Sequence, residues 1–397
     1  MANPRKALAY GLTANVIILS VVSLFTDVSS EMILPILPFF LTQVLFADAL
    51  VVGLVEGLSE SVVSFMKIFS GRLSDSAGKR KRFVAAGYGL STAMKILFPF
   101  VRSWPEFLGM RVLERTGKGV RDAPRDALLT ESTPPETRGK AFGFHRSMDT
   151  AGAIAGPLIT LALLGTIAAS LAMADAYRLI LLLAAIPASI SVLIILLVRE
   201  PSRTPAVRQP LRVTFRGIPR SLLSFLAIAS LFSLADFSYA FLLLRAGLLF
   251  GTTEAILLYV LFNIVYAAHA FPAGILSDRV GRKPVVLIGY IAFVTMSTLL
   301  VFSGALVALV VAFILYGLSY GMAEGTQRAL VADFAPADIK ATVLGAYHTC
   351  VGVVKLASGL TAGLLFTIDP RATFAFGAIA ATIATIGLFL WKPLPRS

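Results

Sequence analysis

The sequence predicts an all-α membrane protein, with twelve transmembrane helices in two pseudo-symmetric halves of six. Three observations predict it: the composition, the long apolar segments and a repeat between the halves. The chain has 397 residues, of which 57% are apolar and only 14% charged, against about 25% charged in soluble proteins. A transmembrane helix needs ~20 predominantly apolar residues. Such segments are expected at residues 13–43, 48–70, 83–101, 106–129, 141–165, 177–198, 221–248, 253–275, 284–303, 305–331, 341–366 and 372–391.

The chain is strongly basic, with a net charge of +13. Such a charge is typical of proteins that bind nucleic acid, but its distribution excludes this class. Most of the 35 lysines and arginines lie in the termini and in loops on the N-terminal side of the apolar segments, and the opposite loops carry Arg102, Arg178 and Arg371. This bias places the basic loops in the cytoplasm. We therefore expect a multi-pass plasma (inner) membrane protein with both termini cytoplasmic and no nucleic-acid partner.

The two halves of the chain repeat one another. Residues 127–136, ALLTESTPPE, resemble residues 329–338, ALVADFAPAD. Between the repeats, residues 199–220 are rich in arginine and proline and form the longest polar stretch. We predict an N-terminal six-helix half at 1–198, a cytoplasmic basic linker at 199–220 and a C-terminal six-helix half at 221–397. Parallel repeats of this kind are how many secondary transporters are built.

Two similar loops follow the second and the eighth apolar segments. They read Gly71-Arg-Leu-Ser-Asp75-Ser-Ala-Gly78-Lys79-Arg80-Lys81 and Gly274-Ile-Leu-Ser-Asp278-Arg279-Val-Gly281-Arg282-Lys283. Each combines an acid, a glycine that permits a tight turn and a basic cluster that holds the loop on the cytoplasmic side.

These loops resemble the loop between the second and third helices of the major facilitator superfamily, with the pattern G-x-L-x-D-[RK]-x-G-[RK]-[RK]. The second copy fits fully, and the first has Ser76 at the position of a basic residue. The resemblance implies an alternating-access transporter, in which Asp75 and Asp278 pair with basic residues and hold the cytoplasmic side closed. The expected gating residues are Gly71, Asp75, Gly78, Lys79, Arg125, Asp126, Gly274, Asp278, Arg279, Gly281 and Arg282.

Charged residues within the apolar segments concentrate in the first, fourth, seventh and tenth, which line the central cavity in the resembled family. Charge in hydrocarbon costs at least ~2.5 kcal/mol per group, so this placement is informative. In the fourth segment, at about 100° per residue, the charged residues from Arg111 to Asp126 fall on one face. This face is interpreted either as a structural lattice of ion pairs or as a substrate surface. The expected substrate-binding residues are Arg115, Lys118, Arg121, Asp122, His145, Arg146 and Glu324.

Two details of the fourth segment follow from spacing. Glu114 and Lys118 are four residues apart, so they are expected to pair. We expect Arg121, near the middle of the segment, to face water and substrate, and Arg125 to belong to the lattice. Because cations outnumber acids on this segment, further partners are expected on neighbouring helices, at Asp27, Glu31 and Asp149.

The first segment carries Asp27 and Glu31, which share a face with Ser23 and Ser30. Carboxylates in a partly dehydrated cavity can bind and release a proton near neutral pH. This face is therefore a candidate for proton coupling, and permanent salt bridges to the fourth segment are the alternative. The expected proton-coupling residues are Asp27, Glu31, Asp149 and Asp236.

These features predict secondary transport of a small solute. The run Gly152-Ala-Ile-Ala-Gly156-Pro157 resembles part of a glycine-proline motif on the fifth helix of family exporters, so proton-coupled export by antiport is the first hypothesis. Its glycines are expected to let another backbone approach closely. Proton-coupled uptake of a small organic anion, drawn to the arginines of residues 106–129, is the second. Divalent metal transport, with His269 and His348 as ligands, and a non-transporting membrane sensor are minor alternatives.

The sequence carries neither an HExxH motif nor a P-loop, which would indicate a metalloprotease or a nucleotide site. We therefore expect no catalytic activity, no cofactor and no resident metal. The expected partners are a small-molecule substrate, protons and the lipid bilayer. The protein is expected to be a monomer.

Overall fold

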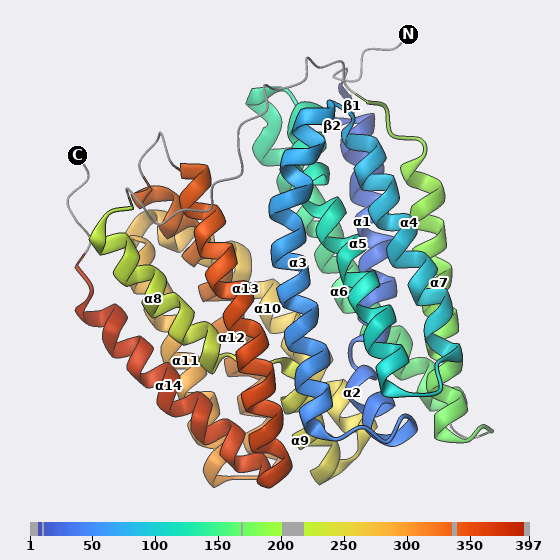
Figure 1. The fold of residues 1–397 in the computed structure, drawn as a ribbon, viewed down its shortest axis with the longest axis vertical. Coiled ribbons are helices and arrows are strands. Elements are labelled where there is room, and N and C mark those ends of the chain that lie inside the picture. Colours follow the sequence, from blue (N-terminus) through green and yellow to red (C-terminus); the bar gives the residue numbers. More distant parts are fainter. Residues whose placement is uncertain (1–6, 10–11, 168–169, 201–217, 336–339, 393–397) are drawn as a thin grey trace. The chain divides into compact units, whose positions relative to one another are not determined.

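Helices form nearly all of the described structure (Figure 1). The computed structural model describes residues 7–9, 12–167, 170–200, 218–335 and 340–392. The elements of the N-terminal part are β1 (Ala7–Ala9), β2 (Leu12–Thr13), α1 (Ala14–Ile33), α2 (Leu37–Phe39), the π-helix η1 (Phe40–Val44), α3 (Ala49–Ala77), α4 (Arg80–Leu97), the 3₁₀ turn η2 (Phe98–Phe100), α5 (Trp104–Glu131), the 3₁₀ turn η3 (Pro135–Thr137), α6 (Arg138–Ile167) and α7 (Met173–Ile195). The C-terminal part comprises α8 (Arg220–Ala235), α9 (Tyr239–Phe250), α10 (Thr252–Val280), α11 (Arg282–Phe302), α12 (Leu306–Phe334), α13 (Lys340–Ile368) and α14 (Pro370–Leu390).

Within the described residues, eleven helical segments are long and apolar enough to cross a membrane. The helix α5 is as long as these segments, with 28 residues, but it carries more charge than an apolar span. It coincides with the fourth predicted segment and completes the set of twelve. The predicted helical membrane fold is confirmed, and β1 and β2 form one short antiparallel pair before it.

The chain divides by contacts into two compact units. Unit 1 comprises residues 1–45 and 62–210, and unit 2 comprises residues 46–61 and 211–397. The helix α3 contributes its first part to unit 2 and the remainder to unit 1. Most of the predicted linker, residues 201–217, lies outside the described residues, so the division at 199–220 remains a prediction.

Small residues let the helices of unit 1 approach one another closely. A Cβ atom added to Gly152 of α6 would lie only 2.8 Å from the carbonyl oxygen of Leu24 on α1, and one added to Gly87 of α4 would lie 2.5 Å from that of Gly117 on α5. Only glycine fits at such crossings. The close approach predicted for the glycines of α6 is thus confirmed.

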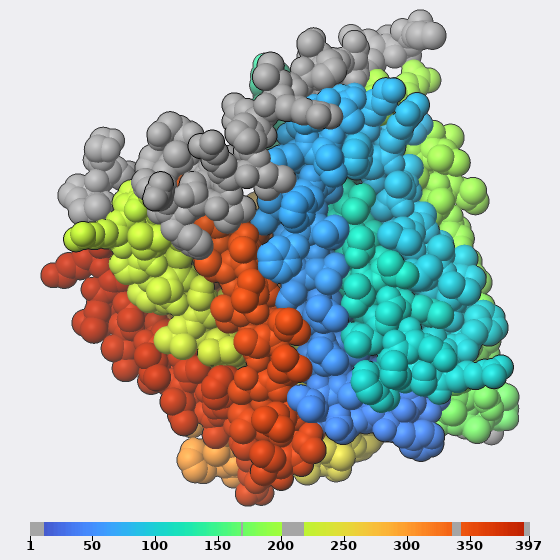
Figure 2. Space-filling model, in the orientation of Figure 1, coloured from blue at the N-terminus to red at the C-terminus, as the bar shows by residue number. Residues whose placement is uncertain are grey.

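The two units have different interiors. Unit 1 has an apolar cluster in which Leu19 and Val22 of α1 lie with Val84 of α4 and Leu128 of α5. Unit 2 is rich in aromatic contacts, with the ring of Phe232 stacked on that of Tyr290 at 3.6 Å. Side chains fill the space between neighbouring helices of each unit on the face shown in Figure 2.

The seventh membrane segment is broken into two helices. The helix α8 ends at Ala235 and α9 begins at Tyr239, with Ser238 as its N-cap: the Ser238 hydroxyl accepts a hydrogen bond from the amide of Ala240. Asp236, between them, has non-helical backbone angles (φ −77°, ψ 79°). Broken membrane helices leave backbone groups that bind ions or substrates in transporters, so this break is part of the candidate site.

Candidate functional site

The helix α5 carries a buried ion network inside unit 1. Glu114, which is only 2% exposed, pairs with Arg111 at 3.0 Å and with Arg115 at 3.5 Å. The predicted pairing of Glu114 with Lys118 is therefore wrong. Arg111 lies three residues before Glu114 and Arg115 directly after it, and both long guanidinium side chains reach the carboxylate.

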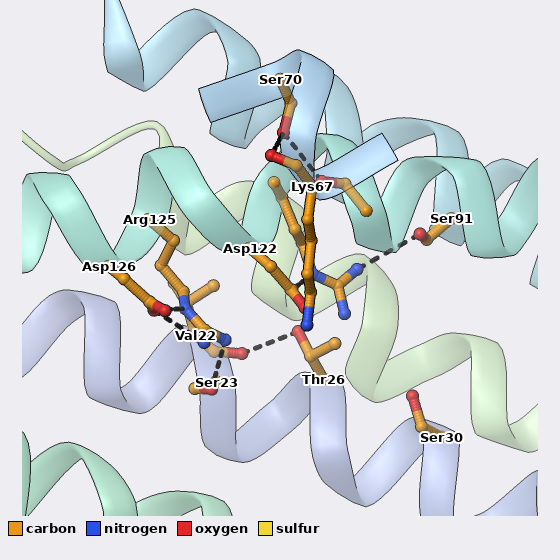
Figure 3. A network of polar contacts seen from close by, with 12 residues as sticks. Val22, Ser23, Thr26, Ser30, Lys67, Ser70, Ser91, Asp122, Arg125 and Asp126 are labelled. Atoms are coloured by element: carbon orange, nitrogen blue, oxygen red, sulfur yellow. Dashed lines mark hydrogen bonds and ion pairs between the residues drawn. The ribbon is translucent and has the colours of Figure 1, made fainter. Parts of the chain in front are cut away.

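The next turns of α5 are tied to α1 and α3. Lys67 of α3 pairs with Asp122 at 2.9 Å. Arg125 pairs with Asp126 at 2.9 Å and donates a hydrogen bond to the hydroxyl of Ser23 on α1. Figure 3 shows these side chains pointing toward one another from three helices. The lattice predicted for Arg125 is present, and the Lys67–Asp122 pair within it joins α3 to α5.

Arg121 lies in the interior of unit 1, between α4 and α5. It is 4% exposed, and its guanidinium lies 4.3 Å from the centre of the Tyr88 ring. One of its nitrogens donates to the hydroxyl of Ser91 at 3.2 Å. The expectation that Arg121 faces water is wrong, because Tyr88 and Ser91 of α4 cover that side of α5.

Arg121→Ala is expected to lower the stability of the protein. The change removes a cation–π contact, which contributes about 2 kcal/mol when desolvated, and leaves a gap beside Tyr88. Thermal unfolding of the purified protein in detergent measures the effect. Arg146→Ala is the matched control, since Arg146 is exposed, and it should melt like the wild type. Equal melting of the two variants would contradict an interior role for Arg121.

Asp27 of α1 is a membrane carboxylate without a close partner. It is partly exposed, and within the described part of the chain it makes neither a hydrogen bond nor an ion pair shorter than 4 Å. The charges of Asp149, Lys118, Glu31 and Arg125 act on it from α1, α5 and α6. These neighbours include the predicted acids on α1 and α6, so the structure brings Asp27, Glu31 and Asp149 together.

His145 and Asp149 lie one turn apart on α6. The nearest ring nitrogen of His145 is 3.9 Å from the carboxylate of Asp149, which is too long for a hydrogen bond. Both ring nitrogens of His145 and one oxygen of Asp149 are buried and form no hydrogen bond with the described part of the chain. Buried polar atoms are almost always satisfied, so this pair is suited to take up a proton or a water molecule.

The repeated loops form the same three-residue ion network in each unit. Arg80 pairs with Asp75 at 2.7 Å and with Glu131 at 3.0 Å. Arg282 likewise pairs with Asp278 at 2.7 Å and with Asp333 at 3.2 Å. The predicted pairing of both aspartates with basic residues is confirmed. The third members, Glu131 and Asp333, were not predicted, although they occupy equivalent positions in the ALLTES and ALVADF repeats.

The other predicted gating residues surround these networks. Gly78 and Gly281 make the turns, with φ of +63° and +92°, where glycine is favoured. In unit 2, the turn borders a cavity of about 410 Å³ lined by Asp278, Arg282 and Asp333 among others. Of the remaining residues, Gly71 and Gly274 lie within α3 and α10, and Lys79 and Arg279 are exposed.

In unit 2, the break between α8 and α9 is the centre of a polar network. Lys355 of α13 donates hydrogen bonds to the carboxylate of Asp236 at 2.6 Å and to its carbonyl at 2.8 Å. The hydroxyl of Ser238 donates to Glu56 at 2.9 Å. Asp236 thus holds an ion pair, unlike Asp27, although both were predicted to bind protons. The contact of Lys355 with Asp236 was not predictable from the sequence, because the two residues lie 119 positions apart on different helices.

Glu324 and Arg328 lie four residues apart on α12, a spacing that predicts an ion pair, and the structure confirms this pair. The hydroxyl of Tyr266 on α10 donates to the other oxygen of Glu324 at 3.3 Å. Tyr320 lies one turn before Glu324 on α12 and contributes to the same charged and aromatic surface. Sequence reasoning found the acid and the base but missed the tyrosines, although Tyr316 and Tyr320 lie four residues apart on α12.

Divalent metal transport finds no support in the geometry, and a sequence match to a nucleophile motif lies in the wrong structural context. Among the described residues, no group of three or more His, Cys, Asp or Glu side chains is arranged to hold a metal ion, and His269 contacts the carbonyl of Val265 at 2.8 Å. Residues 317–321, GLSYG, match the nucleophile motif GxSxG. They lie within the uninterrupted helix α12, whereas the motif acts on a strand-to-helix turn.

Comparison with known proteins identifies the family. The model described as Major Facilitator Superfamily matches residues 19–252 and 221–397. An uncharacterised MFS-type transporter of Methanocaldococcus jannaschii is 39% identical over 386 residues, which cover 96% of this chain and 94% of that protein. Multidrug resistance protein MdtH of Photorhabdus laumondii is 31% identical over 128 residues, covering 32% of this chain and 31% of that protein.

Solved structures have the same fold. A mutant of nucleoside transporter NupG superimposes with a TM-score of 0.81 and 15% identity, covering 94% of this chain and 99% of that one. At this identity the likeness concerns the fold alone. The family model and the M. jannaschii relative extend over nearly the whole chain, and they agree with the helical segments and the repeated loops. The chain belongs to the Major Facilitator Superfamily and is an integral membrane transporter, not an enzyme.

Proposed function

We propose that this transporter exports a small solute in exchange for protons. The observation that carries the proposal is the Asp27 carboxylate, which lies within the membrane segment α1 without a hydrogen bond or close ion pair in the described residues. Intramembrane carboxylates of this kind mark proton pathways. A proton that binds there neutralises a carboxylate that forms no ion pair shorter than 4 Å among the described residues.

The neighbouring acids extend this site. Asp149 and Glu31 act electrostatically on Asp27, so protonation of one carboxylate favours ionisation of the others. We propose that Asp27 and Asp149 carry the transported proton, with Glu31 in support. Asp236 is a weaker candidate, because its carboxylate already holds an ion pair with Lys355.

Export is proposed from two weaker observations. The glycines of α6 that contact α1 belong to the run that resembles the exporter motif. The similarity to MdtH, a multidrug resistance protein, covers about a third of the chain. We propose that the two repeated ion networks close the cytoplasmic side in the outward-open state, and that both termini are cytoplasmic.

Asp27→Asn tests the proton coupling. Vesicles that contain the purified protein and a pH-sensitive dye are given a pH gradient, and a panel of small organic cations, anions and neutral solutes is added. We expect the wild type to release the gradient with some members of the panel. Asp27→Asn should abolish this release while the protein remains folded, because an amide mimics the protonated acid and cannot cycle.

Asp175→Asn is the matched control. Asp175 lies at the exposed start of α7, and this variant should release the gradient like the wild type. Wild-type behaviour of Asp27→Asn would place the coupling site elsewhere, with Asp149→Asn as the next variant. Failure of both variants to alter proton flux would sink the proposal.

Uptake of a small organic anion is the second candidate function, favoured by the excess of cations on α5. The burial of these cations weakens it: Arg111, Arg115 and Arg121 are all at most 5% exposed, and they bind groups within unit 1. Accumulation of an organic anion in vesicles that follows an imposed proton gradient would favour uptake over export.

A further inference from the structure

Arg245 is a cation within the seventh membrane segment to which the proposed transport mechanism gives no role. It belongs to α9, which ends at Phe250, so it lies roughly 7.5 Å before the end of that helix. The residue is only 9% exposed. Charged residues inside membrane segments are rare and are usually paired or functional. The surroundings of Arg245 therefore need to be examined for a partner.

The described part of the chain supplies no partner for this guanidinium. Among those residues, Arg245 forms neither a hydrogen bond nor an ion pair shorter than 4 Å, and its Nε is buried. An arginine carries five N–H donors, and buried polar atoms are almost always satisfied. Lys355, in the same unit, is more exposed and still pairs with Asp236. Arg245 thus lacks the acceptors that its burial requires.

The side chain of Arg245 lies at the end of unit 2 that is opposite the repeated loop. Phe241, Arg245 and Leu249 follow one another at intervals of four, so they share a face of α9. The Phe241 ring lies 5.5 Å from that of Phe366, near the end of α13. A Cβ atom added to Gly304 would lie 3.7 Å from Nη2 of Arg245. The guanidinium therefore lies beside the connection between α11 and α12.

The connection between α13 and α14 brings a second guanidinium to this place. The charges of Arg371 and Asp369 act on Arg245. Asp369 caps α14 and accepts a hydrogen bond from the amide of Arg371 at 2.8 Å, whereas the side chain of Arg371 is exposed. The first turn of α14 also carries the positive end of the helix dipole. These groups favour an anion beside Arg245.

Unit 1 fills the equivalent place with its own backbone. The offset that relates residues 127–136 to residues 329–338 places Ser303 at the position of Val101, and Gly304 at that of Arg102. In unit 1, Arg178 of α7 donates hydrogen bonds to the carbonyls of Pro99 and Val101, the latter at 2.8 Å. Arg245 has no such carbonyl among the described residues. The two arginines therefore differ in where their acceptors come from.

Apolar side chains flank this place at the ends of three helices. Leu248 of α9, Phe302 of α11 and Ile368 of α13 are all largely exposed. In a membrane protein, such side chains near a helix end contact lipid. Lipid headgroups lie at the level of the helix ends, and a long arginine side chain reaches them from within the segment. An anion attached to acyl chains suits these surroundings better than a free ion.

From these observations we propose that Arg245 binds the phosphate group of a phospholipid. The guanidinium donates to the phosphate oxygens, an acceptor whose geometry matches its fork. Arg371 provides the second cationic contact, and the acyl chains lie along Leu248, Phe302 and Ile368. This lipid site is separate from the carboxylates proposed for transport, and it depends on neither proton coupling nor export.

Native mass spectrometry of the purified full-length protein in detergent tests the proposal. The probe is dioleoyl phosphatidylglycerol. Dioleoylglycerol has the same acyl chains without the phosphate, and inorganic phosphate has no acyl chains. We expect the wild type to bind phosphatidylglycerol about tenfold more tightly than dioleoylglycerol, and inorganic phosphate not to displace it. Arg245→Gln should lose this preference, and Arg245→Lys, which retains the charge without the fork, should keep part of it.

Arg102→Gln is the matched control, because Arg102 is exposed in the equivalent connection of unit 1, and it should bind phosphatidylglycerol like the wild type. Melting temperatures establish that each variant is folded. Phosphatidylglycerol should raise the melting temperature of the wild type more than that of Arg245→Gln. Wild-type affinity in Arg245→Gln, or equal binding of phosphatidylglycerol and dioleoylglycerol by the wild type, would overturn the proposal. Displacement of the lipid by inorganic phosphate would identify a site for free ions and overturn the lipid assignment.

Discussion

Arg80→Met is expected to destabilise the protein by about 1.5–3 kcal/mol, because it removes the contacts of a buried guanidinium with two carboxylates, while water still reaches those of Asp75 and Glu131, which are 44% and 25% exposed. The side chain of Arg80 is only 8% exposed and lies between Asp75 and Glu131, at 2.7 and 3.0 Å. Methionine preserves much of the apolar stem, so the loss measures the charge and not the volume. Unfolding of the purified protein in detergent, followed by heat or denaturant, gives the free energy.

The repeat supplies the matched control, Arg282→Met. Arg282 makes the same two contacts in unit 2, but its side chain is 23% exposed, and those of Asp278 and Asp333 are 65% and 31% exposed. Water screens such pairs, which contribute about 0.2–1 kcal/mol. Arg282→Met should therefore cost much less stability than Arg80→Met. Equal losses would show that burial does not set the strength of these networks.

In the proposed function, both loops also gate transport. The two variants differ in whether they can distinguish this gating role from the role of each network in stability. Arg282→Met should leave the protein folded, and any loss of gradient release in that variant then reports on gating. Arg80→Met cannot make this separation, because its folding defect precedes the functional one.

The fold was predictable because its main determinants are local. Each apolar segment is long enough to identify by composition, and the two copies of the acid-glycine-base loop mark equivalent positions in the halves. The break between α8 and α9 was not predictable from residues 221–248, which carry neither glycine nor proline near Asp236. It is held by distant groups: Lys355 and Tyr316 donate to the freed backbone carbonyls of Asp236 and Phe237.

The same difference between local and distant contacts applies to the candidate site. Pairs within one turn of helix or loop were predictable, such as Glu324 with Arg328 and Asp278 with a neighbouring base. Contacts between helices were not, because they depend on the rotation and depth of each helix. Lys67 meets Asp122 across α3 and α5, and Tyr88 covers Arg121. A helical wheel places Arg121 on the charged face but does not reveal that α4 packs against it.

Glu114→Gln is the second change for which we expect a large loss of stability. Glu114 is 2% exposed, and the charges that act on it are those of Arg115, Arg111, Lys95 and Arg121, all of them cations. Lys95 is itself buried and donates hydrogen bonds to the hydroxyls of Ser29 and Ser30, each at 2.9 Å. In this cluster of buried charges, Glu114 pairs directly with two of the bases, Arg111 and Arg115.

Replacement of Glu114 by glutamine preserves the size and one accepting oxygen but removes the negative charge, so that the buried cations repel one another. We expect a loss of about 3–5 kcal/mol, measured by unfolding in detergent. The control Glu324→Gln removes an acid of the same kind from a pair whose side chains are 39% and 44% exposed, and it should cost at most about 1 kcal/mol.

A double-mutant cycle tests the same idea. The double variant Glu114→Gln with Arg111→Gln should lose less stability than the two single variants lose in sum, since removal of one cation relieves the repulsion that the loss of Glu114 creates. Additive losses in this cycle, or equal losses in Glu114→Gln and Glu324→Gln, would show that charge balance around Glu114 does not hold α1, α4 and α5 together.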